Sequence, residues 1–360
     1  MADDKSENMK KDVSEENAGL VEQVQTEHDG QSHSEHEHEG HEHSEHEHDE
    51  HDEQEHAEQW AAALENFRKA GKILAAIKKD AKHMVVPGES AYDIAETVEK
   101  MIFDAGAKPG FPCNVSINDI AAHYTPQIGD KLLIGEKDVV KLDFGVAIEG
   151  CVSDSSMTID LSEEQGKLCE ASKAALEAAI ASIKPGVSTG SIGTIIEKEI
   201  KGRGFKPIEN LSGHMIAPYN LHAGQNIPNI ASNDPYEFEE GDVFAIEPFA
   251  TSGVGRVADQ PQVEIFSIAG DGKLRMRASR ELLLKIVNKY FTLPFAERWL
   301  VGEIKSKLVL SAALKELLNA GCLHPYPVLR EAGRGLVSQY EHTVIVEHDG
   351  AKVITGETDP

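Results

Sequence analysis

The chain has 360 residues, with 35 basic and 62 acidic side chains and a formal net charge of −27 at pH 7. This balance, without any basic run, argues against nucleic acid as a specific ligand. No apolar stretch reaches the roughly 20 residues of a membrane span, and the N-terminus lacks the apolar core of a secretion signal. The four cysteines form no CxxC pair, which fits a reducing cytosol.

The charge is concentrated in residues 1–59, which hold 21 acidic residues, three basic residues and ten of the 17 histidines. This segment has few aliphatic residues and almost no aromatic ones, so it cannot bury enough surface to fold. We therefore expect a disordered acidic tail. Two uses for it stay open: a solubilising segment, or a weak metal buffer that binds through HxH pairs such as His36/His38 and His46/His48.

The first ordered element is predicted to be a helix that begins near Trp60. Its apolar residues recur at helical spacing: Trp60, Ala63, Leu64, Phe67, Ala70, Leu74 and Ile77. A second helix is predicted from about Ala91, with Ser90 as its N-cap and Gly106 as its C-cap.

An equivalent pair of helices is predicted farther along. Ser162 would cap a helix that runs through Ile183, with Gln165 completing a capping box, and a further helix would end at Gly202. The two halves form an internal repeat: PGESAYDI at 87–94 matches PGVSTGSI at 185–192 at Pro, Gly, Ser and Ile. Glu99-Lys100 matches Glu197-Lys198 at the same offset of 98 residues. The repeat predicts two similar lobes related by a pseudo-two-fold axis.

The last third of the chain contains an interruption. Helical patterns occupy about 278–335, and they predict a helical insert within a domain of residues 60–360. The chain then closes with a predicted hairpin, YEHTVIVE and AKVIT, whose turn is at Asp349-Gly350.

Five potential metal ligands lie in five separate strands or strand edges. They are Asp143 in VVKLDFGV, Asp154 in CVSDSSMTI, His214 in LSGHMI, Glu247 in DVFAIEPFA and Glu341 in SQYEHTVIVE. Four carboxylates and one imidazole suit a pair of divalent cations better than a structural zinc. Without metal the carboxylates would repel one another, and some would have to protonate. This donor set favours a two-metal hydrolytic site.

Asp143 and Asp154 are 11 residues apart across a predicted hairpin turn near Glu149-Gly150. If the loop is 148–149, the two aspartates face each other directly, and if it is 149–150, they are diagonal neighbours. Either register places both carboxylates on one face, because side chains alternate along a strand.

Four stretches of sequence together resemble the type 2 methionine aminopeptidases: LDFGVAIEGCVSDSSMT, LSGHMIAPYNLHAGQNIPNI, FAIEPFAT and QYEHTVIV. The motif FPCNVSINDIAAHYTP adds to the likeness, which runs from about residue 60 to the C-terminus and is closest to archaeal members in length and insert. The resemblance implies an α+β, pseudo-two-fold pita-bread fold. Curved, mostly antiparallel sheets would be covered by helices, with a winged-helix-like insert that type 1 enzymes lack.

The resemblance also implies roles for the ligands. Asp154, His214, Glu247 and Glu341 would hold one metal ion, and Asp143, Asp154 and Glu341 the other. The ions would be Co, Mn, Fe(II), Zn or Ni, all of which accept this donor set. Glu247 would also assist proton movement.

Further residues are implied at the substrate site. His123 in AAHYTP and His222 in NLHAG would hydrogen-bond the substrate and the tetrahedral intermediate. Phe111, Tyr326 and Ile265 would wall the methionine pocket. Cys113 would lie near this pocket, and nothing in the sequence assigns it a catalytic role. Ser155, Ser156, Met157 and Met215 depart from the family's commonest residues, and we expect them to touch no ligand.

The implied activity is removal of an N-terminal methionine when the next residue is small. Its substrates would be nascent chains in the cytoplasm, which makes the ribosome a candidate partner of a monomeric enzyme. Three other readings stay open. An X-Pro aminopeptidase or prolidase would share the five ligands. A non-catalytic relative would bind the ribosome or nucleic acid. The third interpretation, a metal-storage protein, depends on the His-rich tail alone.

Overall fold

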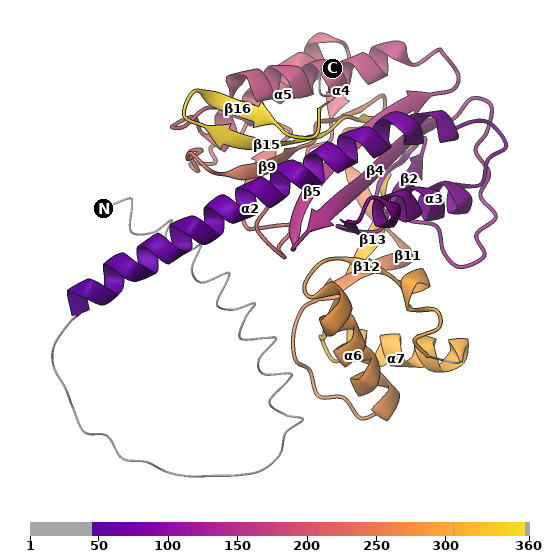
Figure 1. The fold of residues 1–360 in the computed structure, drawn as a ribbon. Helices are drawn as coiled ribbons and strands as arrows, with labels where there is room; N and C mark the ends of the chain where they lie inside the picture. Colours follow the sequence, from indigo (N-terminus) through magenta and orange to yellow (C-terminus); the bar gives the residue numbers. More distant parts are fainter. Residues whose placement is uncertain (1–44, 305, 357–360) are drawn as a thin grey trace.

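The structure, a computed structural model, describes residues 45–304 and 306–356, with the side chains of 45–56 excepted. The predictions for residues 1–44 therefore lie outside the described residues. The chain forms two helix-covered lobes, and a smaller helical segment lies at one end of the molecule (Figure 1). No helix in the described part of the chain is long and apolar enough to cross a bilayer.

The first lobe is built on a four-stranded antiparallel sheet. The central strand is β4, which pairs along its whole length with β5 on one edge and with β1 and β2, at different positions, on the other. A long helix, α2, lies across β4 and β5, so its apolar stripe is buried against the sheet (Figure 1). The elements are α2 (Glu45–Ala81), η1 (Lys82–Met84), α3 (Ala91–Asp104), β1 (Lys108–Pro109), β2 (Asn114–Ile117), β4 (Val139–Ile148) and β5 (Cys151–Asp160).

The second lobe places two packed helices, α4 and α5, over a five-stranded sheet of order β16-β15-β9-β7-β8. A three-stranded sheet, β14-β10-β6, lies beside it. The elements are α4 (Gly166–Ser182), α5 (Thr189–Gly202), β6 (Lys206–Pro207), β7 (Ser212–Met215), β8 (Asn226–Pro228), β9 (Val243–Ile246), β10 (Phe249–Thr251), β14 (Val337–Gln339), β15 (His342–Glu347) and β16 (Gly350–Val353).

The helical segment has its own core, in which Leu282 and Ile286 of α6 meet Leu314 and Leu317 of α7. A sheet of order β12-β11-β13-β3 connects it to the first lobe. The elements are β3 (Ile120–Ala122), β11 (Val257–Ile268), α6 (Arg277–Tyr290), β12 (Phe295–Ala296), η2 (Glu297–Leu300), α7 (Lys307–Asn319) and β13 (Leu323–Glu331).

The internal repeat corresponds to equivalent local structure in the two lobes. Ser90 caps α3 by accepting from the Asp93 amide, and Ser188 caps α5 by accepting from the Ser191 amide. Each preceding glycine takes a left-handed conformation, with φ of 87° at Gly88 and 82° at Gly186. The predicted N-cap Ser90 is therefore confirmed. The C-cap of α3 is Ala105, and the predicted Gly106 follows it with a φ of 79°.

The predicted start of the first helix is wrong. The helix α2 begins at Glu45, so residues 45–59, assigned to a disordered tail, are helical. Glu, Gln and Ala are strong helix formers, and acidic residues near a helix N-terminus interact favourably with its dipole. A helix nucleated from Trp60 onward can therefore extend backward, because each further residue adds one backbone hydrogen bond at low cost.

The predicted N-cap of α4 is also wrong. The helix begins at Gly166, and Gln165 stands at the N-cap position without a side-chain capping bond. The carboxylate of Asp160 accepts from both the amide and the hydroxyl of Ser162, and from the Gln165 amide. Because Asp160 organises this turn, the Ser162 hydroxyl does not cap the helix.

Two boundaries near the C-terminus need adjustment. Helix α6 begins at Arg277, one residue before the predicted helical range of about 278–335, and α7 lies inside that range. Residues 323–331, however, form β13, which pairs with β11 and β3. The last hairpin turns at His348-Asp349, one residue earlier than predicted, because Glu347 pairs with Gly350.

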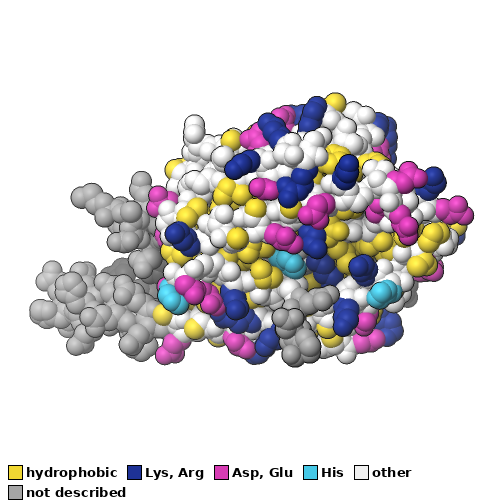
Figure 2. Space-filling view, turned by 90° about the horizontal axis from the view of Figure 1, so that it is seen from above, with side chains coloured by type: hydrophobic (Ala, Val, Ile, Leu, Met, Phe, Trp, Pro, Cys, Tyr) yellow, Lys and Arg dark blue, Asp and Glu magenta, His cyan; other side chains and the backbone are white. Residues whose placement is uncertain are grey.

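The surface seen in Figure 2 is chemically mixed. Acidic and basic side chains are interspersed across this face, with apolar side chains between them.

Candidate metal centre and active site

The five predicted ligands come from both lobes, and all lie in strands or at strand ends. Asp143 is in β4 and Asp154 in β5 of the first lobe, and His214 is in β7 of the second. Glu247 directly follows β9, and Glu341 directly precedes β15. The donor cluster therefore lies where the two lobes meet.

The β4–β5 hairpin fixes the two aspartates. Ile148 pairs with Cys151, so the loop is Glu149-Gly150, the second of the two predicted registers. Both loop residues have positive φ, 47° and 77°, which is the geometry of a tight hairpin turn. Asp154 pairs with Gly145, so Asp143 is its diagonal neighbour on the same face.

Donor atoms from three strands or strand ends lie close together. Ligand atoms of Asp154, His214 and Glu341 all lie within 4.8 Å of one another. The Nε2 atom of His214 is 3.8 Å from Asp154 Oδ2 and 3.8 Å from Glu247 Oε1. The negative charge of Asp143 raises the pKa of Asp154, Glu247 and Glu341.

Side-chain hydroxyls join β5 to the strand that carries Glu341. The Thr343 hydroxyl donates to the Asp154 carbonyl at 2.8 Å and accepts from the Asp154 amide at 2.7 Å. Ser155 donates through Oγ to the Glu341 carbonyl at 2.5 Å. The expectation that Ser155 and Ser156 touch no ligand is therefore wrong. The Ser155 hydroxyl donates to the Glu341 carbonyl, and the Ser156 carbonyl accepts from the Glu341 amide at 3.3 Å, so both help to place the main chain of Glu341.

Three polar residues that the sequence analysis did not select also support the cluster. Lys78 of α2 donates to Ser155 Oγ at 2.6 Å and to the Ser156 carbonyl at 2.8 Å. Gln339 donates to Glu247 Oε2 at 3.1 Å, and Asn114 donates to Asp143 Oδ2 at 3.4 Å. Their only sequence signal is a polar residue within an apolar pattern, which does not identify the partner.

The carboxylates are strongly perturbed by their surroundings. Burial raises the pKa of Asp143 to about 6. For Asp154, Glu247 and Glu341, burial followed by repulsion from neighbouring carboxylates raises each pKa well above its usual range. The Lys78 ammonium opposes this rise at Asp154 and Glu341, but it cannot neutralise so many acids.

Burial has the opposite effect on His214, whose pKa falls to about 4. The imidazole is therefore neutral near pH 7, which is the protonation state required of a metal ligand.

His123, His222 and Tyr326 gather beside the donor cluster. The His222 ring is 4.5 Å from the His214 ring and 6.1 Å from the Tyr326 ring, centroid to centroid. The His123 ring meets the Tyr326 ring edge-on at 5.7 Å. His123 has a φ of 63°, rare for a residue other than glycine, and its Nδ1 lies 3.2 Å from the Pro327 carbonyl. The His222 side chain is the more exposed of the two. Desolvation lowers the pKa of both rings, and the neighbouring His214 and His123 lower that of His222 further.

The three residues predicted to line the methionine pocket lie in two different parts of the structure. Ile265 is directly opposite Tyr326 across β11 and β13, so the two side chains share a face. Phe111 is buried over Gly145, where a Cβ atom would lie only 2.6 Å from its ring. Gly145 is the residue paired with Asp154, which places Phe111 on the hairpin of the two aspartates. Cys113 is fully buried two residues farther along.

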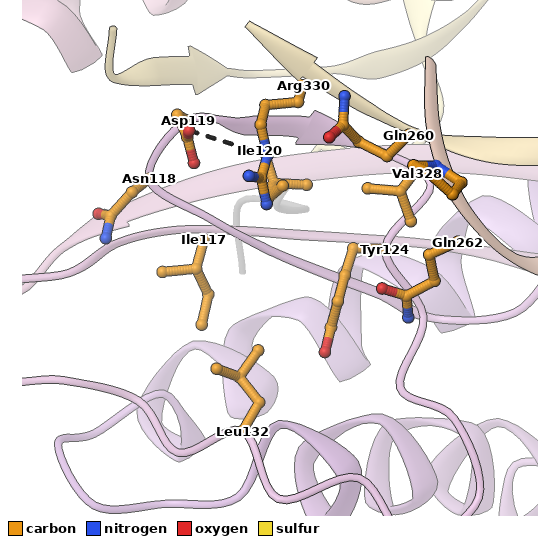
Figure 3. Close-up of a pocket in the computed structure, with 11 residues that line it drawn as sticks. Ile117, Asn118, Asp119, Ile120, Tyr124, Leu132, Gln260, Gln262, Val328 and Arg330 are labelled. Carbon is orange, nitrogen blue, oxygen red and sulfur yellow. Dashed lines mark ion pairs between the residues drawn. The ribbon is translucent and has the colours of Figure 1, made fainter. Parts of the chain in front are cut away.

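A cavity of about 570 Å³ lies among β3, β11, β13 and the turn after β2 (Figure 3). Tyr124, Gln262 and Leu132 line it, and Arg330 forms an ion pair of 3.8 Å with Asp119 at its rim. None of its lining residues belongs to the predicted ligand or substrate set, so this cavity is separate from the donor cluster.

The carboxylate and imidazole groups of the donor cluster are suited to binding divalent metal ions. Within the described part of the chain, Asp143 Oδ1, Asp154 Oδ1 and Glu341 Oε2 are buried and have no hydrogen-bond partner. Buried carboxylate oxygens without a partner are costly, and four neighbouring acids repel one another. Divalent cations would supply both the missing partners and the missing charge.

The fold and this donor set define a two-lobed metallopeptidase. Residues 65–347 match the model of metallopeptidase family M24, and the chain belongs to that family. It is 48% identical over 288 residues to a methionine aminopeptidase of Thermococcus kodakarensis, covering 80% of this chain and 97% of the relative.

Solved structures show the same pita-bread fold. A methionine aminopeptidase of Thermotoga maritima matches with a TM-score of 0.61 at 22% identity, over 82% of this chain and 97% of that one. A prolidase of Pyrococcus furiosus matches with a TM-score of 0.54 at 19% identity, over 83% of this chain but 65% of that one.

Proposed function

We propose that this protein is a methionine aminopeptidase of the type 2 class, which removes an N-terminal methionine that precedes a small residue. The observation that carries the proposal is the five-ligand cluster, with two histidines and Tyr326 beside it. The 48% identity to a curated methionine aminopeptidase, across 97% of that relative, supports the same activity. The helices α6 and α7, where the type 2 insert was expected, support the class.

We propose two divalent ions for the cluster. Asp154, His214, Glu247 and Glu341 would hold one ion, and Asp143, Asp154 and Glu341 the other. When bound, the ions acidify a water molecule and polarise the carbonyl of the first peptide bond. Co, Mn, Fe(II), Zn and Ni all suit this mixture of carboxylate and imidazole donors.

Glu247 is suited to moving a proton at this site. Its carboxylate is held by the Gln339 amide, and its side chain is 15% exposed, so it can reach both a ligand position and solvent. Burial raises its pKa, which brings a carboxylate closer to the pH at which it can accept and return a proton.

His123 and His222 are suited to binding the substrate. The Nδ1 atom of His123 lies at the Pro327 carbonyl, which leaves Nε2 for a hydrogen bond to the substrate. With the pKa of His123 lowered by burial, this ring is neutral at pH 7. Because Nδ1 donates to the Pro327 carbonyl, Nε2 of the neutral ring offers a hydrogen-bond acceptor. His222 would contact the tetrahedral intermediate from the exposed side.

The methionine side chain would lie among Phe111, Tyr326 and Ile265. Aromatic and aliphatic walls suit a flexible thioether. The substrates would be free N-termini of nascent chains in the cytoplasm. A monomer that meets them at the ribosome fits these roles.

One assay separates this proposal from the prolidase reading. Release of methionine from Met-Ala-Ser should exceed hydrolysis of Ala-Pro, and chelation should abolish it until Mn or Co is restored. Full activity in metal-free protein, or a preference for Ala-Pro, would contradict the proposal. A prolidase matches this chain over only 65% of its own length, so that reading has less support.

A further inference from the structure

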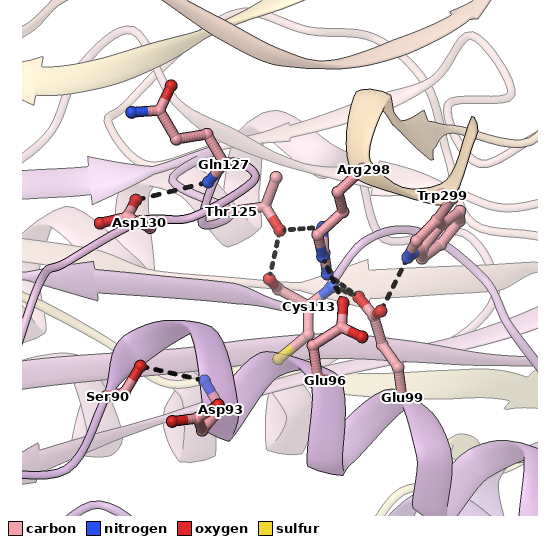
Figure 4. Close-up of polar contacts among 10 residues, drawn as sticks. All are labelled: Ser90, Asp93, Glu96, Glu99, Cys113, Thr125, Gln127, Asp130, Arg298 and Trp299. Carbon is pink, nitrogen blue, oxygen red and sulfur yellow. Dashed lines mark hydrogen bonds and ion pairs between the residues drawn. The ribbon is translucent and has the colours of Figure 1, made fainter. Parts of the chain in front are cut away.

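A buried arginine connects the helical segment to the first lobe. Arg298 lies in η2, between β12 and α7, and its side chain is 2% exposed. It donates through Nε to Glu96 at 3.0 Å, through Nη1 to the Thr125 hydroxyl at 2.8 Å, and through Nη2 to Glu99 (Figure 4). Each guanidinium nitrogen therefore has its own acceptor.

Glu99 of α3 accepts from three residues in two different segments. Its Oε1 accepts from Arg298 and, at 3.0 Å, from the Cys113 amide, and its Oε2 accepts from Trp299 Nε1 at 2.7 Å. The Glu99 side chain is 5% exposed. A buried ion pair is tolerated when its remaining donors and acceptors are satisfied, as they are here.

The Thr125 hydroxyl links this ion pair to a second segment. It accepts from Arg298 and donates to the Cys113 carbonyl at 2.8 Å. Residues 123–127 lie outside regular secondary structure, whereas residues 114–117 form β2, which is paired with β4. The strand is fixed by its own ladder. Residues 123–127 are held to it by one backbone bond, from the Val115 amide to the Tyr124 carbonyl at 2.8 Å, and by side-chain bonds such as that of Thr125.

His123 belongs to this less regular segment, two residues before Thr125. Its backbone has the uncommon φ of 63°. A residue in that conformation persists only when its surroundings hold it there.

The second lobe gives an internal comparison. Glu197, the repeat equivalent of Glu99, likewise accepts from a downstream amide, that of Ala231, at 2.8 Å. Its other partner is Lys201 of its own helix, and its side chain is 21% exposed. In both lobes the glutamate accepts a hydrogen bond from a backbone amide. The buried arginine contacts the glutamate of the lobe that carries His123.

We propose that Arg298 and Thr125 are positioning residues, which fix the His123 segment against β2 and so set the place of the His123 ring at the substrate. The helical segment thereby contributes to catalysis without touching the reacting atoms. This inference rests on the proposed role of His123 in methionine removal.

Thr125→Val and Thr125→Ser form a matched pair, because Val keeps the shape of Thr and Ser keeps the hydroxyl. We expect Thr125→Val to lower kcat/KM for Met-Ala-Ser by about 10- to 100-fold, the scale of a misplaced catalytic group. Thr125→Ser should stay within about twofold of wild type. Metal content should stay at the wild-type level, since the ligands lie on other segments. Assays are run well below each variant's unfolding temperature.

Arg298→Lys is the second variant, and it carries the test if Thr125→Val does not fold. It keeps the charge but cannot reproduce three directed bonds, so we expect a similar loss. Arg277→Lys is its control, because Arg277 is 86% exposed in the same helical segment and bonds only Glu281 among the described partners. We expect that control to match wild type.

A double-mutant cycle with His123→Ala decides the proposal. If Thr125 and Arg298 act through His123, their substitution should change kcat/KM by less than about twofold in the His123→Ala background. Three results would overturn the inference: wild-type activity in Thr125→Val, loss of metal in that variant, or the same fold-loss in both backgrounds. Wild-type release of methionine is measured in the same series, so failure of the proposed function is seen separately.

Discussion

Asp154 belongs to the first lobe, but it lies beside metal-ligand candidates of the second lobe. Its carboxylate lies near His214 and Glu341, and its main chain is bonded to Thr343. His123 differs, because it lies beside Tyr326 and its ring bonds a carbonyl rather than a carboxylate. The two residues should therefore respond differently to substitution.

We predict that Asp154→Asn abolishes methionine release and lowers bound metal. His123→Ala should lower kcat by about 100- to 1,000-fold and leave bound metal near wild type, because it removes a contact to the reacting group alone. Elemental analysis of both purified variants, together with their kinetics, checks this. An equal fall in metal content in the two would contradict the division between ligands and substrate residues.

Lys141 gives a pH-dependent prediction. It is fully buried in β4, donates to the Asn118 carbonyl, and has a pKa lowered by burial to about 7. Below pH 7 the folded and unfolded states are both charged, so the burial cost is fully present. Between about pH 7 and 10 the unfolded chain binds the extra proton, so stability should rise by up to about 1.4 kcal/mol per pH unit from this group.

Lys141→Met should remove that slope. Urea unfolding of both proteins at pH 6, 8 and 9.5 gives the difference directly. The advantage of the Met variant over wild type should be largest at pH 6 and shrink as pH rises. Parallel stability profiles would mean that Lys141 keeps an ordinary pKa.

At the scale of elements, β5 and β15 lie in different sheets, and their relation decides whether Asp154 meets Glu341. Thr343 supplies two of the bonds between them, Ser155 supplies a third, and Thr158 bonds the Gln339 carbonyl at 2.6 Å. Lys78 adds a contact from α2 to both Ser155 and the Glu341 carbonyl. Side-chain hydroxyl groups thus join β5 to the neighbouring sheets, whereas backbone hydrogen bonds join the strands within each sheet.

Thr343→Val should therefore loosen the pair of ligands. We predict a fall in metal affinity of about 10- to 100-fold, the scale seen when groups that orient metal ligands are removed. Thr343→Ser keeps the hydroxyl and should stay close to wild type. Metal titration followed by activity and by calorimetry measures both, and unchanged affinity in Thr343→Val would show that the ladders alone place Asp154.

At the scale of the whole molecule, two similar lobes meet at the donor cluster, and α2 spans the first lobe (Figure 1). From Trp60 onward, α2 packs against the first lobe. Phe67 is fully buried, its carbonyl accepts from Ser153, and its ring meets Trp60 edge-on at 6.5 Å. Residues 1–44 lie outside the described residues, so the proposed tail functions rest on composition alone.

Deleting residues 1–58 should leave the unfolding temperature within about 2 °C of wild type and the rate at saturating metal unchanged. Phe67→Ala is the contrasting variant and should cost about 3–5 kcal/mol, since it empties a packed position. If the His-rich segment buffers metal, the truncated protein should lose activity at a higher free-metal concentration than wild type. Coincident titrations would leave only the solubilising role.

Sequence patterns were sufficient for features that depend on local spacing. The cap at Ser90 follows from cap chemistry, and the shared face of Asp143 and Asp154 follows from the two-residue period of a strand. The two lobes follow from a repeat at a constant offset of 98 residues. The ligand types, read together with the family resemblance, were enough to predict a metallopeptidase. The start of α4 failed because Asp160 outcompeted Ser162 for the turn, and local propensity does not rank such competitors.

Tertiary structure alone decided which side chains support the site. Lys78 meets Ser155 across 77 residues, and Thr343 meets Asp154 across 189. Arg298 reaches Glu99 across 199 residues. Such pairs leave no periodic trace in the chain, because they depend on how two sheets and a helical segment are placed against one another. The sequence determined which residues could bind metal, and the packing of the lobes decided what holds them in place.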